Sequence, residues 1–178
     1  MKVYYVTTKG FDSFSEPRIL IDKYLNGQKK KYAYSILPFS SKYITHIDST
    51  TIQIDDEYYR FTKNETCKMI QEEHSKDICD HFEMITDCVA GQIGVEGPGI
   101  YKIIDQDIYV LMMDGYIKPN KGVGYFPLIA TKNEIKKGIF RRLNKNEYSY
   151  PLRSRHGSII AIDEEDFNRL KKYNDNLL

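Results

Sequence analysis

Val95-Glu96-Gly97-Pro98-Gly99-Ile100 places one carboxylate at the start of an apolar, strand-like run that continues to Asp114. The glycines around Glu96 free the backbone and let other groups approach closely, whereas Pro98 fixes φ and removes a hydrogen-bond donor. This setting indicates that the direction of the Glu96 side chain is specified, which makes it a candidate site residue. A solvated glutamate in an ordinary turn is the alternative interpretation.

A similar unit begins 48 positions earlier in the chain. Ile47-Asp48-Ser49-Thr50 is followed by an acidic turn and an aromatic strand, and the stretch that starts at Val95 is followed by a turn and a strand of the same kind. Four strands in each unit of ~40–50 residues are typical of a β-propeller blade, whose innermost strand begins at the central axis. The repeat therefore predicts that Asp48 and Glu96 lie at the same end of adjacent inner strands. His156 opens the next predicted inner strand and is expected to converge on the same axial pocket.

Alternating apolar and polar residues predict an all-β chain that ends in a short helix. The predicted strands cover residues 2–8, 17–22, 47–54, 58–63, 68–73, 82–86, 95–104, 108–114, 123–131 and 155–162, with a turn and a strand within 135–143. Residues 33–39 and 43–45 are interpreted as loop with a short strand, and residues 75–81 as a helical turn. Acidic residues 163–166 precede apolar residues at helical spacing, which predicts the C-terminal helix. Asp114, in Asp-Gly-Tyr, is predicted to form a turn.

Composition limits the classes of partner and compartment. The 26 Lys and Arg residues of this 178-residue chain balance 25 Asp and Glu residues, for a net charge of +1. We therefore expect neither a nucleic-acid-binding surface nor a patch for anionic membranes. No apolar run reaches the ~18 residues of a membrane span. The start of the chain has no signal-peptide pattern, so a cytoplasmic location is expected if Met1 is the true start. Three cysteines with no zinc-site spacing are expected to be unpaired thiols.

Six short motifs occur in one order along the chain. They are Thr45-His46-Ile47-Asp48-Ser49-Thr50, Tyr58-Tyr59-Arg60-Phe61-Thr62-Lys63-Asn64-Glu65, Gly94-Val95-Glu96-Gly97-Pro98, Met113-Asp114-Gly115-Tyr116, Gly124-Tyr125-Phe126-Pro127 and Arg155-His156-Gly157-Ser158-Ile159-Ile160. Each motif is weak alone, but in this order and spacing the set resembles glycoside hydrolase family 43. The resemblance is closest to the arabinofuranosidase and β-xylosidase-like branches and covers nearly the whole chain.

The resemblance implies a fold and a reaction. The family fold is a five-bladed β-propeller, and its members are inverting glycosidases that use three carboxylates. On this pattern the chain is a single incomplete propeller domain of about three blades. Residues 1–44 match the outer part of blade two and a linker, 45–90 blade three, 91–150 blade four, and 151–178 the start of blade five with a C-terminal helix.

Matching by position also implies roles for single residues. Glu96 matches the general acid, and Asp48 matches the aspartate that tunes and orients it by like-charge repulsion. His156 matches a histidine near the propeller axis, where members hold calcium or another ion through its water shell; no other cofactor is required. Three further residues are expected to contact the sugar: Arg155, Tyr116 and Tyr125. The implied partner is an oligosaccharide with terminal arabinose or xylose.

The chain departs from the family in its first blade. It starts where the second blade is already half finished, and no Asp before Asp48 matches the general base of the family. An inverting reaction needs that base ~6.5–9.5 Å from the acid, so we expect the chain alone to be inactive. Three blades leave open sheet edges, so we expect either a fragment of a longer protein or self-association. Two alternatives remain open: a non-catalytic relic that binds sugar, and a β-rich interaction domain without a carbohydrate role.

Overall fold

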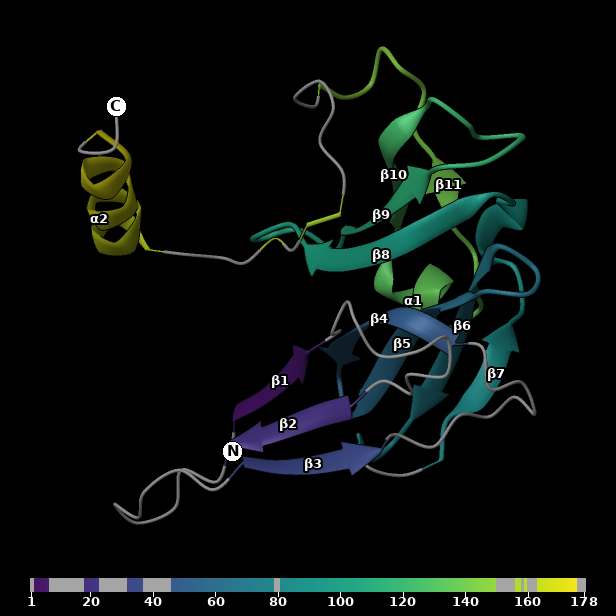
Figure 1. Cartoon of the computed structure of the whole chain (residues 1–178), viewed down its shortest axis with the longest axis horizontal. Coiled ribbons are helices and arrows are strands. Elements are labelled where there is room, and N and C mark those ends of the chain that lie inside the picture. Colours follow the sequence, from purple (N-terminus) through teal and green to yellow (C-terminus); the bar gives the residue numbers. More distant parts are fainter. Residues whose placement is uncertain are drawn as a thin grey trace.

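The computed structural model describes residues 2–6, 18–22, 32–36, 46–78, 81–149, 156–157, 159 and 163–175. Nearly all regular structure in these residues is β, which confirms the predicted all-β class (Figure 1). The first sheet has three antiparallel strands in the order β1-β2-β3: β1 (Lys2–Val6), β2 (Arg18–Asp22) and β3 (Tyr32–Ile36). The C-terminal helix is α2 (Glu164–Asp175), as predicted. No helix in the described part of the chain is long and apolar enough to cross a membrane.

The two four-stranded antiparallel sheets correspond to the two units of the sequence repeat. The second sheet has the order β4-β5-β6-β7, formed by β4 (His46–Ile54), β5 (Glu57–Asn64), β6 (Met69–Ser75) and β7 (Glu83–Thr86). The third has the order β8-β9-β10-β11, formed by β8 (Val95–Lys102), β9 (Tyr109–Gly115), β10 (Gly124–Ala130) and β11 (Arg141–Arg142). Their first strands, β4 and β8, lie next to each other where the two sheets meet (Figure 1). Within the described ranges the sheets do not close into a ring.

One apolar core joins these two sheets. Phe61 and Ile70 from the second sheet pack in the same buried cluster as Leu111 and Phe126 from the third. Phe140 meets Phe61 edge to face, with ring centroids 5.6 Å apart, a geometry that aromatic pairs favour. Burying each such side chain contributes about 1.5–3 kcal/mol. The core therefore fixes the position of β8 against β4 and β5.

Strand β9 is buried on both faces. Leu111 and Met113 point into the main core, whereas Val110 and Met112 pack with Tyr125 in a second cluster. Successive side chains of a strand point to opposite faces, so a strand covered on both sides needs an uninterrupted apolar run. The run Tyr109-Val110-Leu111-Met112-Met113 meets this need and then ends in a carboxylate, Asp114.

Short segments tie the two sheets together. Helix α1 (Lys132–Ile135) begins with a capping box, in which Thr131 and Glu134 satisfy each other's backbone donors. Lys132 and Lys136 both pair with Asp55, which lies in the turn between β4 and β5. These ion pairs are exposed and contribute little energy. The 3-10 helix η1 (Val89–Gly91) leads into β8.

Three predicted elements differ in the structure. Residues 76–78 form bends and a turn rather than the expected helical turn. The turn and strand expected within 135–143 are the end of α1 and the two-residue β11. In the stretch 155–162, the described residues 156, 157 and 159 do not form the expected inner strand. His156 has a φ of 45°, which an extended strand cannot accommodate.

Candidate functional site

A bulge interrupts each of the two inner strands near its start. In β8 the pairing with β9 shifts between Glu96 and Gly99, and in β4 the pairing with β5 shifts between Ile47 and Thr50. The first extra residue has a left-handed backbone in both: φ is 55° at Gly97 and 54° at Asp48. Bulges of this kind redirect side chains and are common beside functional sites. The shared geometry supports the predicted repeat.

The bulges also correct the alignment of the repeat by one residue. Asp48 occupies the position of Gly97, and Glu96 occupies the position of Ile47. Asp48 therefore lies near the start of the neighbouring strand, as predicted, but is not the structural counterpart of Glu96.

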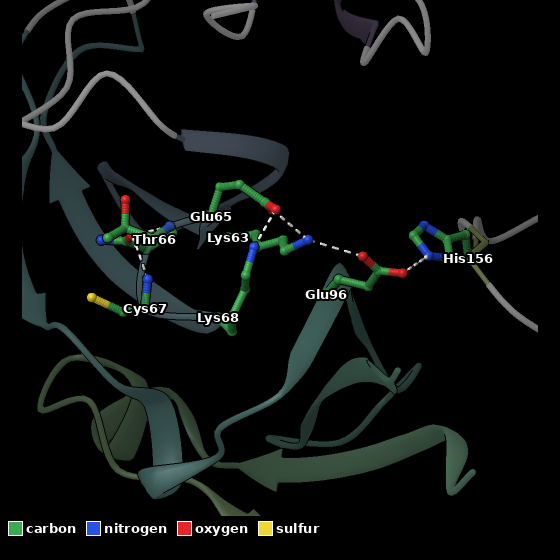
Figure 2. A network of polar contacts seen from close by, with 8 residues as sticks. Lys63, Glu65, Thr66, Cys67, Lys68, Glu96 and His156 are labelled. Atoms are coloured by element: carbon green, nitrogen blue, oxygen red, sulfur yellow. Dashed lines mark hydrogen bonds and ion pairs between the residues drawn. The ribbon is translucent and has the colours of Figure 1, made fainter. Parts of the chain in front are cut away.

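Glu96 receives a hydrogen bond on each carboxylate oxygen. Lys63 of β5 donates to Oε2 at 2.9 Å, and the ring nitrogen Nε2 of His156 lies 3.2 Å from Oε1. Figure 2 shows the Lys63 and His156 side chains on opposite sides of the carboxylate. The Glu96 side chain is 16% exposed. Its carboxylate is therefore held in one direction, in a half-buried position where the two sheets meet.

Asp114 is the cross-strand neighbour of Glu96. Its side chain is fully buried, and its Oδ2 atom lies 3.4 Å from Nε2 of His156. The prediction that Asp114 forms a turn is wrong, because the residue lies within β9. One donor atom each from Glu96, Asp114 and His156 lies within 4.8 Å of the others. The structure thus places the carboxyl groups of Glu96 and Asp114 in one cluster, which the sequence analysis does not predict.

Lys63 supplies the buried positive charge of the site. Its side chain is 3% exposed, and Nζ lies 2.6 Å from a carboxylate oxygen of Glu65 in addition to its bond with Glu96. The ammonium group also lies 4.4 Å from the centre of the Tyr116 ring, a cation–π contact. Glu65 in turn pairs with Lys68 on the same turn.

These contacts set the ionisation of the site. Burial raises the pKa of Glu96, but the hydrogen bonds and charges of Lys63 and His156 outweigh burial and hold that pKa below its usual value. Burial lowers the pKa of Lys63, but Glu65 and Glu96 outweigh it and raise that pKa above its usual value. The site therefore contains a carboxylate and an ammonium ion at neutral pH.

His156 lies directly against the bulge of β8. A Cβ atom added at Gly97 would come within 2.7 Å of Nδ1 of the His156 ring. The hydroxyl of Tyr125 fixes the next residue: it donates to the Gly97 carbonyl at 2.8 Å and lies 3.4 Å from the backbone N–H of Gly157, which donates to it. Glycine at position 97 thus serves both the left-handed backbone and the close approach of the imidazole.

The Gly97→Ala variant should lose about 1–3 kcal/mol of unfolding free energy and displace His156. Gly91→Ala is the matched control, since Gly91 also has a left-handed backbone, with φ of 62°, but a Cβ there meets nothing within 4 Å. Chemical denaturation of both variants separates backbone strain from the clash. Equal losses in the two variants would show that His156 does not lie against Gly97 in solution.

The structure brings some of the predicted site residues together and places others apart. Glu96, His156 and Tyr116 lie together, with Lys63 between the first and the last. Tyr125 is joined to the same region by its hydroxyl, but its ring is 5% exposed and packs with Val110 and Met112. Its ring face is therefore covered by protein. Asp48 is not a member of the Glu96 cluster, and Arg155 lies outside the described residues.

Sequence reasoning missed Lys63 and Asp114. Both occur within quoted motifs, and they occupy equivalent positions: Lys63 pairs with Ile47 just before the bulge of β4, and Asp114 pairs with Glu96 just before the bulge of β8. An alignment of the two units on their second strands, β5 and β9, would have matched Lys63 with Asp114. The alignment of Asp48 with Glu96 does not.

The cluster has the donor types of a metal site, but a cation of the protein already pairs with Glu96. Carboxylate and imidazole groups bind divalent cations. The ammonium of Lys63 supplies the positive charge that a cation would otherwise bring to Glu96. The predicted ion near His156 stays a prediction.

A family model described as a probable glycosyl hydrolase domain matches residues 1–168 of the chain. No curated protein matches the chain significantly.

Proposed function

The chain belongs to a family of probable glycosyl hydrolase domains related to glycoside hydrolase family 43, and from this we propose that its sugar site is the cluster around Glu96. The observation that carries the proposal is the meeting of Glu96, Asp114 and His156 at the junction of two sheets. Paired carboxylates are the working groups of most glycosidases. The cluster also offers donors and acceptors for sugar hydroxyl groups.

Within this proposal Glu96 is the general acid. A general acid must carry a proton when it meets the leaving oxygen, so its pKa must rise towards the working pH. In the free protein Lys63 and His156 hold the pKa of Glu96 low. A sugar that displaces these contacts would leave Glu96 beside the carboxylate of Asp114, and like charges raise a carboxyl pKa. Asp48, on the neighbouring strand, is retained as the proposed orienting residue.

The proposed substrate is an oligosaccharide with terminal arabinose or xylose, and the proposed architecture is part of a five-bladed propeller. Tyr116, partly exposed and next to Lys63, is the proposed stacking surface. Arg155 is a proposed contact to the sugar. The chain alone is proposed to have negligible turnover and to associate through its open sheet edges.

A specific observation favours a second candidate function, a carbohydrate-binding domain without catalysis. The two oxygens of Glu96 accept hydrogen bonds from the ammonium of Lys63 and the imidazole of His156, which suits a carboxylate that binds hydroxyl groups rather than one that donates a proton. The two candidates share one site and differ only in whether bond cleavage follows binding.

Calorimetric titration with arabino- and xylo-oligosaccharides tests whether this site binds sugar. We expect binding, and we expect Glu96→Gln to weaken it about tenfold because hydrogen bonds to a charged group are lost. Glu83→Gln is the control, since its side chain is 77% exposed on β7. Binding that is equal in wild type, Glu96→Gln and Glu83→Gln would contradict the proposed site.

A further inference from the structure

Lys63 has an unusual position for a lysine. It lies at the end of β5 on the face that carries Phe61, with its side chain almost completely buried. A lysine is rarely buried unless its charge is paired. Here two carboxylates and one aromatic ring surround the ammonium group: Glu65, Glu96 and Tyr116.

The internal repeat shows what is specific to this lysine. At the equivalent position of the next sheet the chain has Asp114, a group of opposite charge. Each of the two equivalent residues points out of its own sheet: Lys63 reaches Glu96 of the third sheet, and Asp114 reaches His156. A repeat maintained only for packing has no need of opposite charges at these positions. The difference places an ammonium group and a second carboxyl group beside the Glu96 carboxylate.

We propose that Lys63 is the positioning residue of the sugar site, which fixes the direction of the Glu96 carboxylate and shares its ammonium group between Glu96 and Glu65. This inference rests on the proposed function of the same site. Lys63 does not touch the sugar; it acts through Glu96. Because its hydrogen bonds are shielded from water, they are stronger and more directional than those of a surface lysine.

Glu65 is a second ion-pair partner for the ammonium group of Lys63. It lies on the turn between β5 and β6, is partly exposed, and also pairs with Lys68. A ligand hydroxyl that binds Oε2 of Glu96 can therefore displace Lys63 towards Glu65 without leaving a buried charge unpaired. Four titratable groups thus surround Glu96. Lys63 and His156 are its hydrogen-bond donors, Asp114 is a second carboxyl group, and Glu65 competes with Glu96 for the ammonium of Lys63.

The test uses crystal structures of two variants and one control. In Lys63→Met we expect the Glu96 carboxylate to rotate away from β5, whereas in Lys63→Arg, which retains the cation, we expect it to keep its direction. Lys132→Met is the control because the side chain of Lys132 forms an exposed ion pair with Asp55, outside the sugar site. A Glu96 carboxylate that keeps its direction in Lys63→Met would overturn the proposal. This result does not depend on sugar binding, so it is separate from any failure of the proposed function.

Sugar affinity supplies a second measurement on the same proteins. We expect Lys63→Met to bind arabino- or xylo-oligosaccharides about tenfold more weakly, Lys63→Arg to recover part of the loss, and Lys132→Met to bind as wild type. If Lys63 had a purely structural role, Lys63→Arg and Lys63→Met would lose the same sugar affinity. Equal losses would therefore count against a positioning role. If Lys63→Met does not fold, Glu65→Gln provides the test: the ammonium then belongs to Glu96 alone, and the Glu96 direction must be unchanged. A rotated Glu96 in Glu65→Gln would contradict the shared contact.

Discussion

The advantage of Glu72→Met over wild type in unfolding free energy is expected to grow by about 4 kcal/mol between pH 5 and pH 8. Glu72 lies in the middle of β6 with no exposed surface. Neither of its carboxyl oxygens accepts a hydrogen bond from the described part of the protein. Burial raises the pKa of Glu72 from 4.5 to about 9, because a charged carboxylate is disfavoured away from water.

The sign of the effect follows from this raised pKa. The folded protein holds the Glu72 proton more tightly than the unfolded chain, so the proton stabilises the fold fully below pH 4.5. As pH rises from 4.5 towards 9, the unfolded chain ionises and the folded protein does not, and this stabilisation is lost. A methionine of similar length has no proton to lose, so its advantage grows with pH.

Denaturant titrations of both proteins at several pH values measure this difference. Other titratable groups are common to the two proteins, so their contributions cancel in the comparison. Glu83→Met is the control, because Glu83 is exposed, and its unfolding free energy should follow that of wild type at each pH. Parallel curves for wild type and Glu72→Met would show that Glu72 ionises in the folded protein at an ordinary pH.

Cleavage of arabino- and xylo-oligosaccharides by the chain alone is expected to be negligible at pH 7 and to increase as pH falls. One reason is the state of Glu96 in the free protein, where Lys63 and His156 hold its pKa below the usual value of 4.5. An ionised carboxylate cannot protonate a leaving oxygen, and loss of a general acid lowers the rate about 10²–10⁴-fold. Acidification restores the protonated form and with it part of the rate. Product release measured from pH 3.5 to 8 checks this expectation.

The Glu96→Gln variant separates the two proposed functions. If Glu96 is a general acid, the variant loses the rate that acidification restores, and it loses more with a sugar leaving group than with a nitrophenyl glycoside, which needs less protonation. Fast cleavage at pH 7 that disappears in Glu96→Gln would show that the low pKa of the free protein is not the working state. Cleavage unaffected by the substitution would exclude the acid role.

The sequence was sufficient to predict the β architecture. Alternation in Tyr58–Lys63 and the continuous apolar run before Asp114 mark strands because side-chain burial follows the period of the strand. The repeat predicted two four-stranded units, and both are present. His156 is expected in a strand because the apolar residues after it fit the pattern. Its positive φ and its close approach to Gly97 have no local signal in the sequence.

The candidate site could be predicted only in part. Glu96 was found because glycine and proline around one acid are a local signal. Lys63 was not, because a lysine in a strand pattern is ordinarily a solvent-exposed residue, and its burial depends on the packing of β5 against β8. Asp114 was missed because Asp-Gly is a common turn signal. The register of the two bulges determines that Asp48 is not equivalent to Glu96. This register has no local signal in the sequence.

A crystal structure of the chain soaked with arabino- or xylo-oligosaccharide tests the central claim most directly. The account predicts a sugar at the junction of β4 and β8, with one of its oxygens within hydrogen-bond distance of the Glu96 carboxylate and with the Lys63–Glu96 contact of 2.9 Å lengthened or broken. A sugar bound elsewhere on the protein, with Glu96 still held between Lys63 and His156, would contradict it.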